Sequence, residues 1–395
     1  MTAANLSDRT SRRIGIVELV SFSTLLFPKA GMNLQGIPLT MNLFLVAILI
    51  LVCIFRYSSY LKMNDIILLS FILPWILLCL TRSNALIENR TLRFGSFYWF
   101  VLVPIFWVSA NNLRRSGRKI SPKLVIYCSF GATLFGIGQF VWGLNFLKIT
   151  GLTIAWGDSY ERKNLSIFDS STTIGTKIPS TFQGGNIWGQ CSSVVLIWVV
   201  VFKVWRIFES RLLQIASVIS PAVAVFLSFS RTAVVASIFS LALYFLRDRR
   251  RGLGVGAFLG IVGLLAFFTS KFSQGRYSVE SFSNSAGRST QWFAGLTNFS
   301  LNDWIFGRSN ILPDSAFHME GILGLFGQVG ILGFLLILLL WITTFKGSFA
   351  WLGLPTLICV ILDSTYLTPP LLLFPSILFL ARFPGDAPQY LEFQR

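Results

Sequence analysis

The sequence predicts an all-α membrane protein with about twelve transmembrane helices. Its composition is 54% hydrophobic with only 12% charged residues, whereas soluble domains carry about a quarter charged residues. The apolar residues also form nearly unbroken blocks, at 45–55, 66–80, 194–202 and 332–341. Such blocks are typical of membrane-spanning helices, because only a helix satisfies its own backbone hydrogen bonds within lipid.

Apolar segments extend along the whole chain, so we expect residues 1–395 to form a single integral membrane domain. The spans are predicted near residues 14–30, 37–55, 64–81, 94–110, 124–147, 187–205, 212–228, 231–246, 253–270, 320–344, 348–362 and 367–381. Three prolines within the last range argue against a straight helix there. No small-residue cleavage site follows the first apolar stretch, so it is not expected to be a cleaved signal peptide.

The charge pattern orients these spans with both termini in the cytoplasm. If the N-terminus lies inside, the inside loops are short and basic: 56–62, 111–123, 203–211, 247–251 and the turn at Lys346. This agrees with the excess of Lys and Arg in cytoplasmic loops of membrane proteins. The turn that contains Arg82, Arg90 and Arg93 departs from the pattern. The net charge of +17 is therefore interpreted as a signal of orientation and not of nucleic-acid binding.

Two of the outside loops are unusually long. They span about residues 148–185 and 271–319, and neither is hydrophobic enough to form a core of its own. Connections of this length are uncommon and usually functional. We therefore expect the chemistry to take place at the periplasmic face.

His318 is the only histidine in the chain and ends the second long loop. If this segment is helical, Asp314 lies four residues earlier on the same face. A carboxylate in that position could orient the imidazole and raise its basicity, as a general base requires. The alternative interpretation is an interfacial histidine that only caps or packs.

Arg231 lies in a tight turn between two apolar spans and is predicted to be outside. A cation in such a turn is costly, so an ionisable residue there is a functional candidate by default. The alternative is an arginine that extends to lipid phosphate groups.

Both long loops contain further residues suited to phosphate and sugar. In the second loop, Trp292 lies one helical turn after Arg288. Arginine binds phosphate oxygens with two parallel hydrogen bonds, and a tryptophan face suits a sugar ring or a lipid tail. The other candidates are Arg276 and Arg308 in this loop, and Arg162 and Asn186 in or after the first loop. Each could instead be an ordinary solvated loop residue.

Glycines recur at spacings that favour close helix packing. Gly256 and Gly260 form a GxxxG pair, and every third residue from 321 to 333 is glycine. Small residues let membrane helices approach closely, so we interpret these glycines as packing positions and not as a ligand loop.

The sequence lacks the motifs of several kinds of catalytic and metal-binding site. The five cysteines are not paired at metal or redox spacing, and there is only one histidine, so no metal site is expected. The chain also has no P-loop and no G-x-S-x-G motif.

Four short motifs follow one another within residues 150–345. They are Gly-Gly-Asn at 184–186, Ser-Phe-Ser-Arg at 228–231, Arg-x3-Trp at 288–292 with Ile-Phe-Gly at 305–307, and Phe-His at 317–318 followed by the glycines of 321–333. In order and topology they resemble the bacterial O-antigen polymerase (Wzy-type) and O-antigen ligase superfamily of membrane glycosyltransferases. The first four spans contain no signature of this family.

The resemblance implies a GT-C-like helical fold in the bacterial inner membrane. It implies that donor and acceptor glycans are linked to undecaprenyl pyrophosphate and that neither a metal nor another cofactor is needed. Arg231 and Arg288 would hold the donor pyrophosphate, and His318 would act on or position the attacking hydroxyl group. A membrane protein that regulates chain length is an implied partner, and nucleic acid is not.

Three functions remain open at this point. Polymerases of this family carry an Arg-x10-Gly pattern in two outside loops, which Arg276 and Gly287 match, whereas Arg162 and Gly175 are separated by twelve residues and do not. We therefore expect a polymerase of lipid-linked repeats, with a ligase that transfers glycan to lipid A-core as the closest alternative. A lipid-linked sugar flippase or another transporter is the alternative of a different class, although no repeated halves support it.

Overall fold

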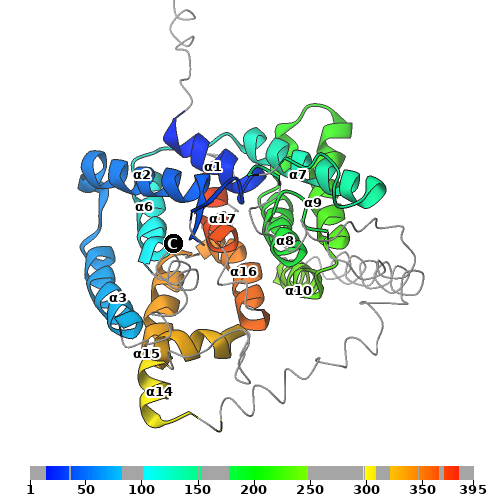
Figure 1. Ribbon diagram of the computed structural model, residues 1–395. Coiled ribbons are helices and arrows are strands. Elements are labelled where there is room, and N and C mark those ends of the chain that lie inside the picture. The colour runs from blue at the N-terminus through cyan, green and yellow to red at the C-terminus, as the bar shows by residue number, and fades with distance from the viewer. Residues whose placement is uncertain are drawn as a thin grey trace, which may run out of the picture.

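The computed structural model describes residues 15–34, 37–81, 101–149, 151–153, 178–182, 184–247, 297, 299–307, 321–345, 347–363 and 369–381. Helices account for 80% of these residues, which confirms the all-α class (Figure 1). Each predicted span overlaps a described helix except 253–270, which lies outside the described residues. The two long loops also lie almost entirely outside them.

The N-terminal third contains the only β-strands among the described residues. Helix α1 (Ile16–Leu26) leads into a hairpin of β1 (Gly31–Leu34) and β2 (Ile37–Thr40), followed by α2 (Met41–Arg56), the 3-10 turn η1 (Ser58–Tyr60) and α3 (Met63–Thr81). The hairpin is antiparallel and pairs Gly31 with Thr40. The sequence wrongly predicted a span from residue 37, because the mostly apolar residues of β2 lead directly into the apolar run of α2.

The remaining helices follow in two groups. The first contains α6 (Val103–Arg115), α7 (Pro122–Trp142), α8 (Gly185–Val201), the 3-10 turn η4 (Val204–Ile207), α9 (Arg211–Leu227) and α10 (Arg231–Arg247). The second contains α14 (Leu301–Phe306), α15 (Gly321–Thr344), the 3-10 turn η5 (Gly347–Phe349), α16 (Ala350–Leu362) and α17 (Pro369–Leu380).

Helix length bears on how the chain could cross a membrane. Within the described residues, only α7 is both long and apolar enough to span a bilayer, and eight further apolar helices or segments of helices have 10–17 residues. A helix rises 1.5 Å per residue, so about 20 residues are needed to cross 30 Å of hydrocarbon. Four helices also contain an internal proline, and α15 is kinked at Gly330. The crossings by the shorter helices therefore stay a prediction.

Helix α8 forms the centre of the core. All of its residues are buried except Asn186 and Val200, which are partly exposed. It packs against α9 and α10 on one side and against α16 and α17 on the other, as Figure 1 shows. Most polar groups on α8 are consequently enclosed by neighbouring helices.

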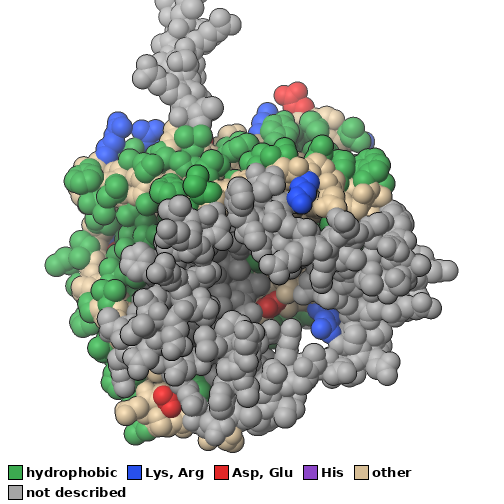
Figure 2. Space-filling model, viewed as in Figure 1, with side chains coloured by type: hydrophobic (Ala, Val, Ile, Leu, Met, Phe, Trp, Pro, Cys, Tyr) green, Lys and Arg blue, Asp and Glu red, His purple; other side chains and the backbone are tan. Residues whose placement is uncertain are grey.

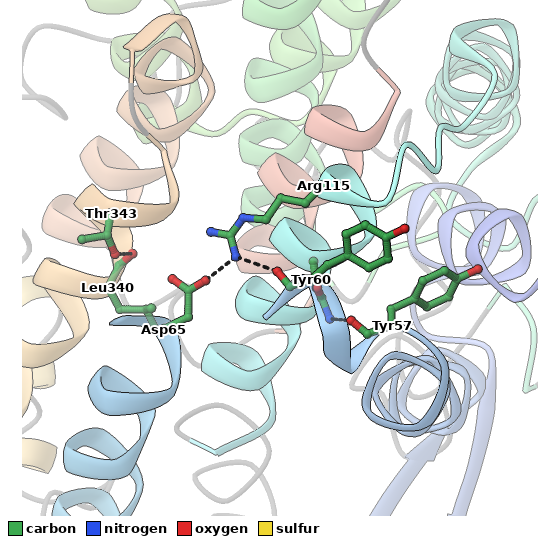
Figure 3. A network of polar contacts seen from close by, with 7 residues as sticks. Tyr57, Tyr60, Asp65, Arg115, Leu340 and Thr343 are labelled. Atoms are coloured by element: carbon green, nitrogen blue, oxygen red, sulfur yellow. Dashed lines mark hydrogen bonds and ion pairs between the residues drawn. The ribbon is translucent and has the colours of Figure 1, made fainter. Parts of the chain in front are cut away.

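The turns that the sequence assigned to the cytoplasmic side contact one another. The Arg115 guanidinium donates to the Asp65 carboxylate at 2.6 Å and to the Tyr60 carbonyl at 3.4 Å (Figure 3). The Arg114 guanidinium lies 5.0 Å from the centre of the Phe349 ring and 4.1 Å from that of the Phe379 ring. These contacts join the end of α6 to η1, to the start of α3, to η5 and to the end of α17.

The Arg115–Asp65 pair gives a first testable prediction. We expect Arg115→Ala to lower the free energy of unfolding by about 1 kcal/mol, because both groups are only partly shielded from solvent. A double-mutant cycle with Asp65→Asn in detergent should assign most of this loss to the pair. Lys119→Ala changes an exposed cation four residues later and should have no measurable effect. Equal losses in the two single variants without coupling would contradict the prediction.

Candidate functional site

Two of the predicted site residues lie within the described structure. They are Asn186, in the first turn of α8, and Arg231, the first residue of α10. The others lie outside the described residues: His318, Arg288, Arg276, Asp314, Arg162, Trp292 and Arg308. The described part of the site is therefore built around α8 and the turn that precedes α10.

The turn before Arg231 is held by its two serines. Phe229 adopts a left-handed conformation with φ of 52°. The Ser228 hydroxyl donates to the Val225 carbonyl at 2.7 Å and accepts from the Ser230 N–H at 3.3 Å. The Ser230 hydroxyl accepts from the Ala233 N–H at 3.3 Å, as a residue at a helix N-terminus does. These bonds fix where α10 begins and thereby place Arg231 at its positive end.

Gly189 lets α8 approach this turn closely. A Cβ atom built on Gly189 would lie 2.1 Å from the Ser228 hydroxyl oxygen and 3.1 Å from the Ala233 Cβ. Any larger residue would therefore push the turn away from α8. Two motifs predicted independently, at 184–186 and 228–231, thus lie at the same end of α8.

A buried acid lies at the same end of α8 and was not predicted as a site residue. The Asp363 carboxylate, 6% exposed, accepts hydrogen bonds from the side-chain amides of Asn186 at 3.0 Å and Gln190 at 3.1 Å. Asp363 ends α16, where its own N–H donates to the Cys359 carbonyl at 2.9 Å. The signal that could have revealed it is a pair of amides four residues apart in an apolar helix, since these need a polar partner.

The contact of α8 with Asp363 and its contact with the turn before Arg231 use neighbouring positions of the helix. Asn186, Gly189 and Gln190 are separated by three and four residues and so lie on one side of the helix. Asn186 and Gln190 contact the end of α16, while Gly189 contacts the turn that leads to Arg231. The end of α8 therefore connects an acid on one neighbour with a basic residue on the other.

A small apolar cavity of about 60 Å³ lies between α6, α15, α16 and α17. The described residues that form its walls carry no charge; they are Val103, Pro104, Trp107, Leu325, Phe334, Ile337, Leu338, Trp341, Leu357, Val360 and Leu372. Val360 is one turn before Asp363 on α16. The cavity thus begins one helical turn from the buried acid, and its lining suits a hydrocarbon chain.

The Ile-Phe-Gly motif packs against the glycine-rich helix. The Ile305 carbonyl touches the backbone of α15 at Gly330, where a Cβ atom would lie 1.9 Å from its oxygen. The Phe306 ring stacks on Trp75 with centroids 5.3 Å apart, and the Trp75 N–H donates to the Val329 carbonyl at 3.0 Å. Gly333 also lies against Trp75. The packing interpretation is confirmed at Gly330 and Gly333, whereas Gly256 and Gly260 lie outside the described residues.

No group of three or more His, Cys, Asp or Glu residues that could hold a metal ion is found within the described ranges. The arrangement instead combines a basic residue at a helix N-terminus, a buried carboxylate with two amides, and an adjacent apolar cavity.

No family model, no curated protein and no solved structure matches this chain.

Proposed function

We propose that this protein is a membrane glycosyltransferase that joins lipid-linked oligosaccharide repeats, an O-antigen polymerase of the Wzy type. The observation that carries the proposal is the packing of the Ser228–Arg231 turn against Gly189. It places a basic residue at the N-terminus of α10, beside the end of α8 that bears Asn186. A helix N-terminus and an arginine together favour a phosphate anion.

The surface of the described residues supports a membrane location. Large hydrophobic side chains are exposed in several helices, including Phe55 at 82% and Leu212 at 75%, and hydrophobic groups dominate the described surface in Figure 2. Contiguous exposed apolar surface of this kind marks a contact with lipid or protein. The contacts among the turns assigned to the cytoplasmic side are consistent with the proposed topology. In that topology Arg231 and Asp363 lie toward the periplasm.

In the proposed reaction, a hydroxyl oxygen of the acceptor glycan forms a bond to the anomeric carbon of the donor glycan. The bond from that carbon to the lipid pyrophosphate breaks, and the pyrophosphate leaves with the bonding electrons. Arg231 stabilises the negative charge that develops on it, together with Arg288 as the family resemblance implies. By the same resemblance His318 receives the hydroxyl proton or positions the hydroxyl group.

The apolar cavity supports a lipid-linked substrate. It borders α16 one turn before Asp363, so a ligand with its polar part at the end of α8 could place a hydrocarbon chain there. Apolar walls gain free energy by covering such a chain, at about 25 cal/mol per Å² of apolar surface removed from water.

The test is the effect of Arg231→Ala on surface polysaccharide in a strain that lacks the native gene. We expect loss of the long chains with retention of a single capped repeat, because the donor pyrophosphate is no longer neutralised. Removing one such electrostatic contact typically costs about 100- to 1,000-fold in rate. Polysaccharide would be resolved by length on a gel.

Arg247→Ala is the matched control, since Arg247 ends the same helix and lies 6.0 Å from the Trp351 ring. It should leave the chain-length pattern intact. Loss of every capped species in Arg231→Ala would indicate a ligase. A normal ladder from Arg231→Ala, with protein present in the membrane, would contradict the assignment of Arg231.

A further inference from the structure

Two short basic segments meet at the face that is proposed to be cytoplasmic. Residues 56–65, which join α2 to α3, and 111–123, which join α6 to α7, contain seven Lys or Arg residues and one acid, Asp65. The Arg115 guanidinium already pairs with this acid at 2.6 Å. The other cations therefore form a positive surface that no acid of these two segments balances.

Tyr57 brings two of these cations to one place. The Arg118 Nε–H donates to the Tyr57 hydroxyl oxygen at 2.9 Å, and the Arg56 guanidinium lies 6.0 Å from the centre of the Tyr57 ring. The buried Asn112 amide donates to the Tyr57 carbonyl at 2.7 Å, which fixes the tyrosine against α6. The Tyr57 ring points away from the ion pair of Asp65 (Figure 3). Arg56 and Arg118 thus form a site that is separate from that pair.

The chemistry of this site fits a phosphate anion. Both arginine side chains are exposed, and the Tyr57 hydroxyl takes only one of the several N–H donors of Arg118. Guanidinium groups bind phosphate oxygens with parallel hydrogen bonds, and these bonds are strong because both partners are charged. Two arginines from separate segments can therefore hold one phosphate group between them.

The neighbouring side chains indicate that this phosphate belongs to a membrane lipid. Phe55 precedes Arg56 and is 82% exposed, and Met63 follows Lys62 and is 69% exposed. Such apolar side chains are stable among acyl chains while adjacent cations extend to the lipid headgroups. Tyr60, also exposed, is of the aromatic type that is enriched at that level. An acidic protein would neutralise the cations but leave these apolar side chains without a partner.

We propose that Arg56 and Arg118, held by Tyr57, bind the headgroup phosphate of an anionic phospholipid in the cytoplasmic leaflet. A zwitterionic lipid is disfavoured because the cation of its headgroup would repel the two arginines. The bound lipid links the end of α2 to the loop after α6, which are 61 residues apart in sequence at Tyr57 and Arg118. This inference rests on the membrane location proposed above and not on the proposed reaction.

The experiment counts the lipids bound to purified, delipidated full-length protein in detergent by native mass spectrometry. The probes are phosphatidylglycerol, which is anionic, and phosphatidylcholine, which is zwitterionic. We expect Arg118→Gln to weaken the tightest phosphatidylglycerol site about fivefold, the usual contribution of one basic residue beside an anionic membrane surface. Arg56→Gln should weaken it by a similar factor. Neither variant should change the binding of phosphatidylcholine.

Arg211→Gln is the matched control, since Arg211 is exposed in a different basic turn, at the start of α9. It changes the net charge by the same amount and should leave the tightest phosphatidylglycerol site intact. Tyr57→Phe removes only the hydroxyl group that holds Arg118. We expect it to weaken phosphatidylglycerol binding about threefold, because the lipid must then order the guanidinium itself. It should have no further effect when Arg118 is already replaced by glutamine.

Three outcomes would overturn the proposal. Equal weakening by Arg118→Gln and Arg211→Gln would show that overall charge alone attracts the lipid. Displacement of phosphatidylglycerol by an equal concentration of glycerol phosphate would assign the site to a soluble phosphate, and displacement by polyglutamate would assign it to an acidic protein. Lipid binding is measured without glycan transfer, so failure of this inference leaves the proposed reaction open to its own test.

Discussion

Gly330→Ala should lower the free energy of unfolding by about 3 kcal/mol or more. Gly330 has φ of 68° and ψ of 174° inside α15, a conformation that is essentially restricted to glycine. The added Cβ would also lie 1.9 Å from the Ile305 carbonyl oxygen and 2.8 Å from the Phe306 backbone nitrogen. Backbone atoms cannot rotate aside as a flexible side chain can, so α14 would have to separate from α15.

Gly347→Ala separates the two causes of this loss. Gly347 has φ of 61° but no atom within 4 Å of an added Cβ, so alanine there should cost about 1–2 kcal/mol from backbone strain alone. Thermal unfolding in detergent, monitored by circular dichroism, would compare the variants. Equal destabilisation of both would show that the Ile305 contact contributes nothing.

Gly189→Ala should cost about 1–3 kcal/mol and also disturb the site. The new methyl group would overlap the Ser228 side chain, which is fully buried and bonded to the Val225 carbonyl. The turn that bears Arg231 would shift away from α8. We therefore expect a lower melting temperature together with shorter polysaccharide chains in cells.

Two further variants test whether the close approach of α8 to the turn at Ser228 causes the effect of Gly189→Ala. Gly184→Ala, at the start of the same helix, has open space around the new Cβ and should cost less than about 1 kcal/mol. Ser228→Gly removes the atoms that Gly189→Ala would overlap, so the double variant should recover part of the lost stability. If Ser228→Gly gives no recovery, the close approach of α8 to this turn is not the cause.

The sequence predicts the helices well because they depend on local hydropathy. Ranges such as 212–228 and 231–246 fall within a residue of α9 and α10, since apolar runs and basic turns are properties of adjacent residues. The hairpin of β1 and β2 and the kink at Gly330 were not predicted. The kink depends on the Ile305 carbonyl from another element, and no local pattern encodes such a contact.

The candidate site was predictable in part for the same reason. Asn186 and Arg231 stand out because each is polar within an apolar neighbourhood. Asp363 was missed because its partners are 177 and 173 residues away in sequence, and it follows an apolar helix as many loop acids do. Gln190 was missed because a single amide within a span resembles a packing residue until its partner is known.

The indole contacts between distant helices set an order for assembly during synthesis. Trp75 donates to the Val329 carbonyl and Trp107 to the Leu372 carbonyl, across 254 and 265 residues of chain. At about 5–20 residues per second, the ribosome needs roughly 10–50 s to supply each acceptor. Until then, α3 and α6 cannot reach their final packing. The early helices therefore wait with these positions unpacked, and degradation of nascent chains should concentrate in that interval.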